Sequence, residues 1–324
     1  MSVLSFIELS EGKIKKASWE AAYYGSQVAN QLGVASEAVV LGSADAQELS
    51  TLGVYGITKV HHVADARFNT FDSRAFTKAV CEVAAATSSR CIVLSFNQNG
   101  KLLGPRISVR LKAGLVPGAS ELPSSVNDWQ VRKNVFSGKA TATYKVHTPV
   151  AVLSVNPNSV TPVKGTGSAE VVAASVSVSD NDFTVRVTQT EKVQGTVPLT
   201  EAERVVSGGR GLKGPENWGM IEELATELGA ATACSRAVSD VDWRPHHEHV
   251  GQTGITIRPN LYIAAGISGA IQHLAGVNGS KVIVVVNTDP EAPFFKAADY
   301  GVVGDAFDVI PKLTAEIKKL RANG

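Results

Sequence analysis

The chain has 324 residues, enough for about two domains that each bury a core of their own. Hydrophobic residues make up 44% and charged residues 19% of the sequence, a balance typical of a globular protein rather than of a long disordered one. The 31 Lys and Arg against 30 Asp and Glu leave a formal net charge of +1. This balance excludes a protein that attracts nucleic acid or anionic lipid through bulk charge.

The longest apolar runs, such as residues 282–286, are far shorter than the ~18 residues that a membrane helix needs. We therefore expect no insertion into a membrane, and residues 1–8 show no pattern of a secretory signal. Cys81, Cys91 and Cys234 are odd in number and form no C-x-x-C pair, which argues against a disulfide framework or a thiolate metal site. These features predict a protein of the reducing cytoplasm.

Strand-like and helix-like segments alternate from the N-terminus, which predicts parallel-sheet units. The expected elements are strands at 3–9, 38–41, 59–63 and 91–95, helices at 19–32 and 73–86, a break at 97–100 and an amphipathic stretch at 102–115.

Between about 120 and 191 the composition shifts to Val, Thr and Ser. We expect antiparallel or mixed strands here, which complete a first domain of residues 1–191. Residues 192–199 are predicted to be a linker, and residues 200–324 a second domain.

The second domain returns to strict alternation. The expected elements are strands at 204–207, 230–235, 261–265, 281–286 and 300–303, and helices at 216–228, 269–275 and 307–321. The pattern predicts an α/β fold for both domains, with a doubly wound parallel sheet in the second.

A glycine pattern follows the first strand of the second domain. Gly209, Gly211 and Gly214 satisfy G-x-G-x-x-G between a strand and a helix, where the pattern can approach a pyrophosphate; the alternative is a merely tight turn. An NAD site also needs a carboxylate at the end of the next strand, but that strand runs into Arg236. Ordinary NAD binding is therefore disfavoured, whereas Arg236 can meet the 2′-phosphate of NADP or lie beside another electron-rich ring.

A second turn of small residues, 266–270, follows the strand 261–265. Its N–H groups and the Ser268 hydroxyl are typical of an anion nest, and two such turns in one sheet indicate a ligand that crosses several strand ends. His273 falls on the first turn of the next helix, where it either contacts the ligand or is a hydrogen-bonded structural residue.

The loop between these turns holds three histidines and a glutamate at 246–249. H-E-x-x-H is absent, and residues this close in a loop do not easily converge on one tetrahedron, so we expect no metal. The Gly-Gln-Thr-Gly turn at 251–254 instead offers two polar side chains that can face a ring system. Cys234 shows no activating partner and no paired carboxylates are evident, so any chemistry should be that of a cofactor.

Several segments, taken in order, resemble the alpha subunit of the electron transfer flavoprotein family. They are Gly208-Gly209-Arg210-Gly211 and residues 234–237, 250–254, 261–264, 266–276, 287–293 and 298–301. The resemblance covers the whole second domain and, in the first, the alternating pattern and Gly104-Pro105-Arg106. It implies a Rossmann-like first domain and an FAD-binding second domain.

The resemblance also implies which residues bind FAD. The positions that match the family's FAD-contacting motifs are Arg210, Ser235, Arg236, Val250, Gly251, Gln252, Thr253, Ser268, Gly269, Ala270, Ile271, Gln272, His273, Asn287, Asp305 and Ala306. Arg236 and Thr253 would lie beside the flavin ring, Thr253 near N5, and His273 would meet the C2 carbonyl. The region around Ser268 would serve the phosphates, and Asn287 and Asp305 the adenosine half. The histidines at 246–249 depart from the family's general pattern.

The implied function is that of an electron carrier in the bacterial cytoplasm. The chain would be the FAD-bearing subunit of a heterodimer with a beta subunit. It would take single electrons from dehydrogenases, acyl-CoA dehydrogenases in most of the family, and deliver them to a membrane quinone reductase. A guanidinium and an imidazole near N1 and the C2 oxygen would stabilise the negative charge of an added electron. Two alternatives stay open: an NADP-dependent oxidoreductase built on residues 209–214 and Arg236, and a nucleotide-sensing structural subunit.

Overall fold

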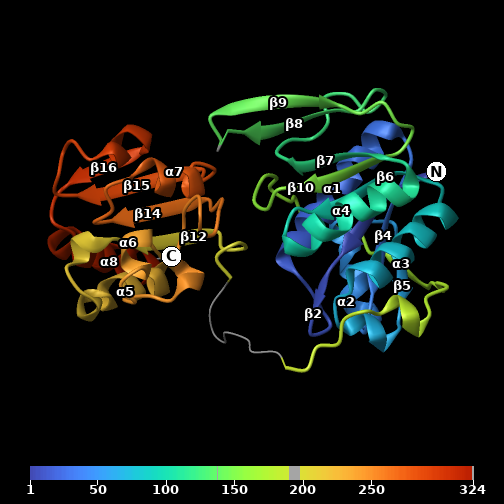
Figure 1. The fold of residues 1–324 in the computed structure, drawn as a ribbon, viewed down its shortest axis with the longest axis horizontal. Coiled ribbons are helices and arrows are strands. Elements are labelled where there is room, and N and C mark those ends of the chain that lie inside the picture. Colours follow the sequence, from blue (N-terminus) through green and yellow to red (C-terminus); the bar gives the residue numbers. More distant parts are fainter. Residues whose placement is uncertain (137, 190–197, 323–324) are drawn as a thin grey trace. The chain divides into compact units, whose positions relative to one another are not determined.

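The computed structural model describes residues 1–136, 138–189 and 198–322. The chain forms two compact units, which we call unit 1 (residues 1–191) and unit 2 (residues 192–324) (Figure 1). Most of the expected linker, 192–199, lies outside the described residues. Within the described part of the chain, no helix has the length and apolar character needed to cross a membrane.

Unit 1 is built on a parallel sheet of seven strands in the order β11-β5-β4-β1-β6-β10-β7. Its strands are β1 (Ser2–Ile7), β4 (Ala35–Leu41), β5 (Lys59–Val63), β6 (Ser89–Ser95), β7 (Gly114–Ala119), β10 (Ala151–Val155) and β11 (Glu170–Ala173), with two antiparallel hairpins, β2 (Leu9–Ser10) with β3 (Lys13–Ile14) and β8 (Gln130–Val135) with β9 (Ala140–Lys145).

The expectation of antiparallel or mixed strands over 120–191 is correct for the β8–β9 hairpin and wrong for β10 and β11, which join the parallel sheet. Every residue of β10 is buried. A strand buried on both faces is typical of the interior of a parallel sheet, and the Val-rich composition of this strand does not by itself reveal the direction of its neighbours.

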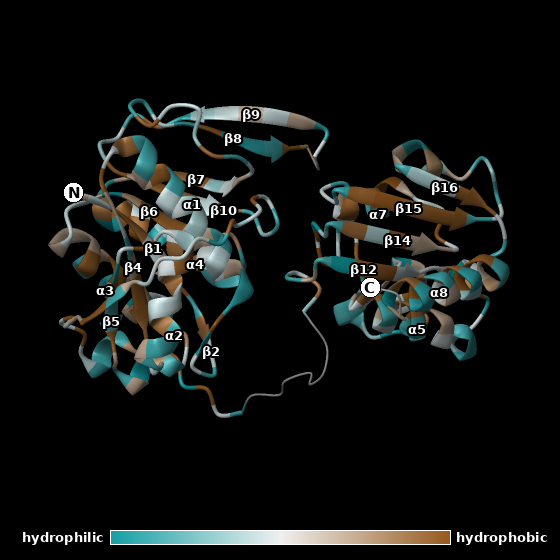
Figure 2. Cartoon of the chain, turned by 180° about the vertical axis from the view of Figure 1, so that it is seen from behind, coloured by the Kyte–Doolittle hydropathy of each residue, from teal (hydrophilic) through white to brown (hydrophobic). Residues whose placement is uncertain are grey.

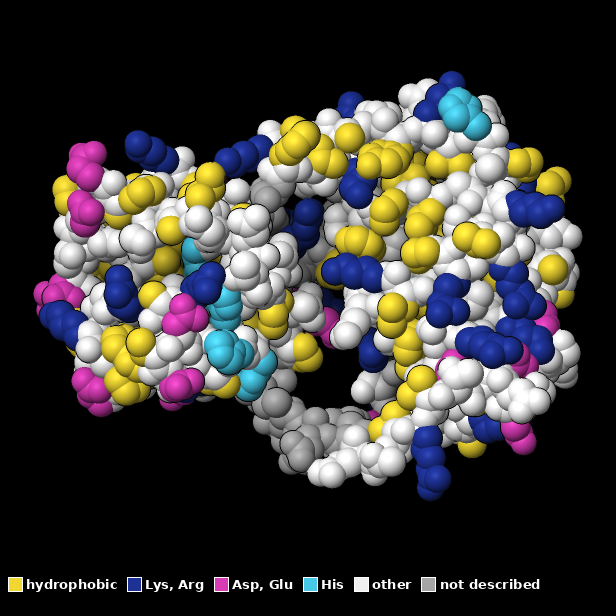
Figure 3. Space-filling model, viewed as in Figure 1, with side chains coloured by type: hydrophobic (Ala, Val, Ile, Leu, Met, Phe, Trp, Pro, Cys, Tyr) yellow, Lys and Arg dark blue, Asp and Glu magenta, His cyan; other side chains and the backbone are white. Residues whose placement is uncertain are grey.

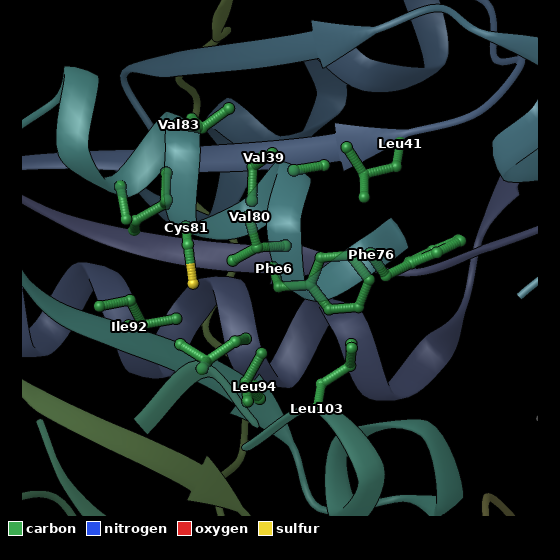
Figure 4. Packing of buried hydrophobic residues seen from close by; sticks show 14 of the residues in the cluster. Phe6, Val39, Leu41, Phe76, Val80, Cys81, Val83, Ile92, Leu94 and Leu103 are labelled. Carbon is green, nitrogen blue, oxygen red and sulfur yellow. The ribbon is translucent and has the colours of Figure 1, made fainter. Parts of the chain in front are cut away.

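Helices cover both faces of this sheet. They are α1 (Lys16–Leu32), α2 (Ala46–Ser50), α3 (Ser73–Ala86) and α4 (Gln98–Leu111), with 3₁₀ turns at Thr51–Tyr55, Ala66–Asn69 and Asp180–Asp182. On one face, Phe76 and Val80 of α3 and Leu103 of α4 pack against Phe6 and Val39 (Figure 4). The opposite face is covered by α1 and α2, so the sheet is wound on both sides.

The helix α4 begins earlier than the sequence suggested. Asn97 does not end an element but caps this helix, because its side-chain oxygen accepts a hydrogen bond of 2.9 Å from the Gly100 N–H. The expected break at 97–100 is therefore the cap and first turn of α4.

A buried carboxylate occupies the point of unit 1 at which the strand order reverses. The chain passes from β1 to β4 and β5 and then returns to β6 on the other side of β1. Glu8, directly after β1, is 6% exposed and accepts hydrogen bonds from the side-chain amides of Asn97 (2.5 Å) and Asn99 (2.6 Å), which follow β6. The carboxyl ends of β1 and β6 are thus joined by the chain's own side chains.

Unit 2 contains a parallel sheet of five strands in the order β13-β12-β14-β15-β16. Its elements are β12 (Arg204–Gly208), β13 (Ala231–Cys234), β14 (Leu261–Ala265), β15 (Val282–Asn287), β16 (Tyr300–Val303), α5 (Gly219–Leu228), α6 (Arg236–Ser239), α7 (Ile271–Val277) and α8 (Ala306–Ala322), with 3₁₀ turns at Arg210–Leu212, Pro215–Asn217, His246–Glu248 and Pro293–Ala297. The predicted α/β fold with parallel sheets is confirmed in both units.

The strands of unit 2 are mostly hydrophobic, and its helices carry both polar and hydrophobic residues (Figure 2). Ile221 and Leu224 of α5 and Ile310 of α8 pack on one face, together with Val206 and Ile263. Tyr262 and Val277 belong to the cluster on the other face, which α7 covers. These two layers hold the strand ends in register.

Candidate functional site

The carboxyl ends of four strands of unit 2 meet at one edge of its sheet. Gly208 of β12 pairs with Cys234 of β13 and with Ala265 of β14, and Val286 of β15 pairs with Ala265. The chain passes from β12 to β13 and then returns to β14 on the other side of β12, so the strand order reverses between β12 and β14. In open α/β sheets, ligands bind in the crevice at this point.

A cavity of about 470 Å³ lies at this edge. Most of the residues predicted to bind a cofactor line it. They are Arg210, Ser235, Arg236, Val250, Gly251, Gln252, Thr253, Ser268, Ala270, Gln272, His273 and Asn287. Residues far apart in the sequence are brought together because the loops after parallel strands leave the sheet at the same edge.

Four predicted positions lie outside the cavity lining: Gly269, Ile271, Asp305 and Ala306. Gly269 packs against Phe294, and Ile271 is 58% exposed at the start of α7. The Asp305 carboxylate accepts a 3.0 Å hydrogen bond from the Phe307 N–H at the start of α8. Because β16 pairs with β15, Asp305 lies one strand further along the same edge than Asn287.

The cavity is also lined by Gly211 of the glycine motif, by Gly266 and Ile267 of the second turn, and by three residues that the sequence analysis did not assign to the ligand: Ala237, His249 and Asp289. Most of them adjoin a selected residue in the sequence. His249 was considered only as a metal ligand, and its position directly before the Gly-Gln-Thr-Gly turn is the signal that could have revealed it.

The G-x-G-x-x-G pattern serves to pack two turns together. The Gly209 N–H donates to the Ala265 carbonyl and the Gly211 N–H to the Gly266 carbonyl, both at 3.0 Å. A Cβ at Gly211 would lie 2.6 Å from the Gly266 Cα. After Gly214 comes a 3₁₀ turn, and α5 begins only at residue 219. The helix expected from 216 therefore begins as a 3₁₀ turn and becomes α-helical only at 219.

The His273 imidazole is held at the cavity wall in an apolar setting. Only 7% of the residue is exposed, and its Nε2 lies 2.8 Å from the Tyr262 hydroxyl. Its Nδ1 is buried and has no hydrogen-bond partner within the described residues. Burial lowers the pKa of His273 to about 4; the neighbouring His249 adds to the shift, and the Val250 backbone opposes it. The ring is therefore neutral at neutral pH.

His249 lies inside the turn that carries Gln252 and Thr253. A Cβ at Gly254 would stand 2.8 Å from its Nδ1, and a Cβ at Gly251 would stand 3.3 Å from its Nε2. Burial lowers the pKa of His249, with Arg236 and His246 acting in the same direction and Asp240 opposing them. The turn is fixed at its other side by a 2.7 Å hydrogen bond from the Gln252 N–H to the Gln272 carbonyl of α7.

Two arginines bring positive charge to the cavity. Arg210 follows β12, and Arg236 is the first residue of α6 after β13. The Arg236 guanidinium is 64% exposed and lies 3.2 Å from the Asp240 carboxylate, one helical turn away. Such an exposed ion pair is weak, so Arg236 remains available to a ligand with negative charge.

Arg244 links the histidine-rich segment, residues 246–249, to the helix α5 of unit 2. Its guanidinium contacts both oxygens of Glu248 (2.8 and 2.6 Å) and one oxygen of Glu222 in α5 (2.8 Å), and it lies over the Trp218 ring. Histidine side chains gather on one face of this unit (Figure 3). No group of three or more metal-binding side chains is found in the ranges that the structure describes.

The comparisons with known proteins agree with this architecture. Residues 3–179 match the model of the electron transfer flavoprotein domain, and residues 198–278 match that of the electron transfer flavoprotein FAD-binding domain. The alpha subunit of the electron transfer flavoprotein from Syntrophomonas wolfei is 36% identical over 323 residues, which cover 97% of this chain and 98% of that protein.

Other relatives match over similar lengths. The corresponding alpha subunits of Bacillus subtilis and Mycobacterium leprae are 35% and 36% identical over 314 and 319 residues, which cover 97% of this chain in both cases and 96% and 98% of those proteins. The cofactor of unit 2 is FAD. The buried Nδ1 of His273, the two guanidinium groups and the Ser268 hydroxyl suit a ligand that presents carbonyl and phosphate oxygens. The chain belongs to the electron transfer flavoprotein family, as an alpha subunit.

Proposed function

We propose that the chain is the FAD-carrying alpha subunit of a heterodimer with a beta subunit, in the cytoplasm of a bacterium. It passes single electrons from acyl-CoA dehydrogenases of fatty acid beta-oxidation to a membrane quinone reductase and has no small-molecule substrate of its own. The observation that carries this proposal is the cavity at the reversal point of the unit 2 sheet, with a neutral buried imidazole on one wall and guanidinium groups on others.

The domain roles follow from the same placement. We assign FAD to a domain of residues 200–324 and the contact with the beta subunit to a domain of residues 1–191. In unit 1 the corresponding reversal point is filled by Glu8 and its amide partners, which favours a role in assembly over a second nucleotide site of the same kind.

The bound FAD supplies one-electron chemistry. Around it, we assign His273 to the C2 carbonyl and Arg236 and Thr253 to the ring, with Thr253 near N5. His273 would donate a hydrogen bond to the carbonyl oxygen, and Arg236 would stabilise negative charge that arrives with an electron. These groups raise the affinity of the site for the reduced cofactor without giving or taking a proton.

The remaining assignments follow the sheet edge. The turn at Ser268 would hold the phosphates, and Asn287 at the end of β15 and Asp305 after β16 would hold the adenosine half. Gly269, Ala270, Ile271 and Gln272 would contribute backbone groups to this stretch. The Asn287 side chain already donates to the Ile267 carbonyl (3.0 Å) and accepts from the Asp289 N–H (3.0 Å), so it also fixes the floor of the site.

The test is to purify the full-length chain with its beta subunit, record the visible spectrum and mix the complex with a reduced acyl-CoA dehydrogenase. The proposal predicts flavin absorption, one FAD in unit 2 and electron uptake in single steps. A colourless complex, whether it reduces NADP with some substrate or is inert, would contradict the proposal. Flavin that no acyl-CoA dehydrogenase reduces would contradict the assigned donor.

A further inference from the structure

A buried hydroxyl group lies behind the imidazole that faces the cavity. The Tyr262 side chain, on β14, is fully buried, and its hydroxyl is 2.8 Å from Nε2 of His273 on α7. The other ring nitrogen, Nδ1, is buried without a hydrogen-bond partner in the described part of the chain, on a residue that lines the cavity. The state of Nδ1 therefore depends on what Tyr262 does at Nε2.

Two arrangements of protons are compatible with this distance, because a neutral imidazole carries one proton. If the Tyr262 hydroxyl donates to Nε2, then Nδ1 carries the ring proton and is a donor. If Nε2 donates to the phenol oxygen, then Nδ1 is a bare acceptor, and the phenol proton must find another acceptor. The second arrangement leaves a buried, unpaired lone pair on Nδ1 of a residue that lines the cavity.

The surroundings of Tyr262 favour the first arrangement. Among the described residues the Tyr262 hydroxyl bonds only to Nε2 of His273, so in the second arrangement the buried phenol proton would have no acceptor. The hydroxyl of Ser207, fully buried on the neighbouring strand β12, has no hydrogen-bond partner among the described residues. The phenol proton therefore has an acceptor when the Tyr262 hydroxyl donates to Nε2 of His273.

The cavity itself needs a donor at Nδ1. Its guanidinium groups, on Arg210 and Arg236, donate hydrogen bonds and accept none, so a ligand that suits them presents oxygen acceptors. A bare Nδ1 would repel such an oxygen, whereas Nδ1–H would pair with it. The fixed partner of one imidazole nitrogen decides the role of the other.

We infer that Tyr262 is a positioning residue: its hydroxyl donates to Nε2 of His273 and thereby keeps the ring proton on Nδ1, where it is offered to an acceptor in the cavity. Under the proposed function, on which this identification rests, that acceptor is the C2 carbonyl of FAD. Tyr262 itself touches no ligand and acts through His273.

The experiment measures the tautomer directly in the full-length chain labelled with ¹⁵N-histidine. Long-range ¹H–¹⁵N correlation spectra distinguish a protonated from a bare ring nitrogen, and His273→Gln assigns the signals. The wild-type protein is expected to carry its proton on Nδ1, with and without added FAD. In Tyr262→Phe the proton moves to Nε2 in most molecules, because an unconstrained imidazole favours that form. Tyr300→Phe, which removes an exposed hydroxyl of β16, should leave the tautomer unchanged.

A second readout follows the same variants through FAD affinity. Loss of one neutral hydrogen bond weakens binding by up to about tenfold, so Tyr262→Phe should raise the dissociation constant of FAD while Tyr300→Phe does not. A wild-type proton on Nε2, or an unchanged tautomer in Tyr262→Phe, would overturn the inference even if FAD binds. A protein with the stated tautomer that binds no FAD would contradict the proposed function and leave this inference intact.

Discussion

The His249 ring fills the space that a side chain at Gly254 would need. A methyl group at position 254 would lie 2.4 Å from the carbonyl oxygen of His249 and 2.8 Å from its Nδ1, both inside van der Waals contact. A side chain at position 254 would therefore clash with His249. The turn that carries Gln252 and Thr253 keeps its shape only while position 254 has no side chain.

We therefore expect Gly254→Ala to displace either the His249 ring or the turn, and to weaken FAD binding by about tenfold or more, since overpacking costs on the order of 1 to 3 kcal/mol. Titration of the purified protein with FAD measures the effect. Gly219→Ala is the matched control, because a Cβ there meets no atom within 4 Å. Equal affinities in the two variants would show that His249 does not shape the turn.

The glycines at 209 and 214 should respond differently to the same substitution. A Cβ at Gly209 would come 2.8 Å from the Ile267 side chain and closer still to the Gly266 carbonyl, whereas a Cβ at Gly214 would meet only the end of the flexible Glu216 side chain. Gly209→Ala should destabilise unit 2 by about 1 to 3 kcal/mol, and Gly214→Ala by much less. Hydrogen exchange of the β12 and β14 amides measures both. Similar losses at the two positions would argue against packing as the reason for the motif.

The stability of unit 2 should fall in mild acid because of His273. Its pKa is lowered from 6.5 to about 4. Between pH 6.5 and pH 4 the unfolded chain therefore binds a proton at His273 that the folded chain does not bind. The resulting stability is present above pH 6.5 and is lost as the pH falls toward 4; at about 1.4 kcal/mol per pKa unit it amounts to on the order of 3 kcal/mol.

His273→Gln should flatten this pH dependence, which hydrogen exchange of β14 amides at several pH values can follow. His247→Gln, which removes an exposed imidazole of the same unit, is the control. If His273→Gln kept the acid-sensitive slope of the wild type, another group would be responsible.

Arg236→Ala should lower the one-electron reduction potential of the bound FAD by about 100 mV. A charged hydrogen bond contributes roughly 1.5 to 3 kcal/mol, or about 60 to 130 mV for a one-electron couple. Asp240→Asn removes the carboxylate that lies 3.2 Å from Arg236, and it should shift the potential upward. Spectroelectrochemical titration of both variants gives the answer, and an unchanged potential in Arg236→Ala would remove this arginine from the role.

Arg244→Met should destabilise unit 2 by about 1 to 3 kcal/mol, because Glu248 is 8% exposed and would lose its bidentate partner. Lys318→Met breaks only an exposed pair with Glu223, so its effect should stay below about 1 kcal/mol. Chemical unfolding followed by hydrogen exchange in α5 separates the two. Equal effects would mean that Arg244 is no more than a surface charge.

The strands of unit 2 could be predicted well because each is a short run of apolar residues between turn formers. The expected bounds of β14 and β16 agree with the structure. Helix starts were less predictable, since Asn97 serves as a cap and Pro215 opens a 3₁₀ turn before α5. Both residue types also occur in loops, and only tertiary contacts distinguish these uses.

Ser268 could be predicted from the turn that follows its strand, because such loops leave the sheet at one edge, whereas Ser235 was implied only by the family resemblance. The packing role of the glycines could not be predicted from the sequence. Gly211 faces Gly266 from a distant part of the sequence, and a local pattern does not state which backbone approaches it. His249 was missed for a similar reason, since its ring is enclosed by a turn that follows it.

In unit 1, Glu8 and its partners Asn97 and Asn99 occupy the point at which the strand order reverses. The folding free energy of unit 1 therefore does not depend on the cofactor, whereas unit 2 gains stability by mass action from the FAD that it binds. Riboflavin starvation should therefore lower the stability of unit 2 and leave the stability of unit 1 unchanged. Degradation in such cells should begin at the C-terminal end and leave an N-terminal fragment behind.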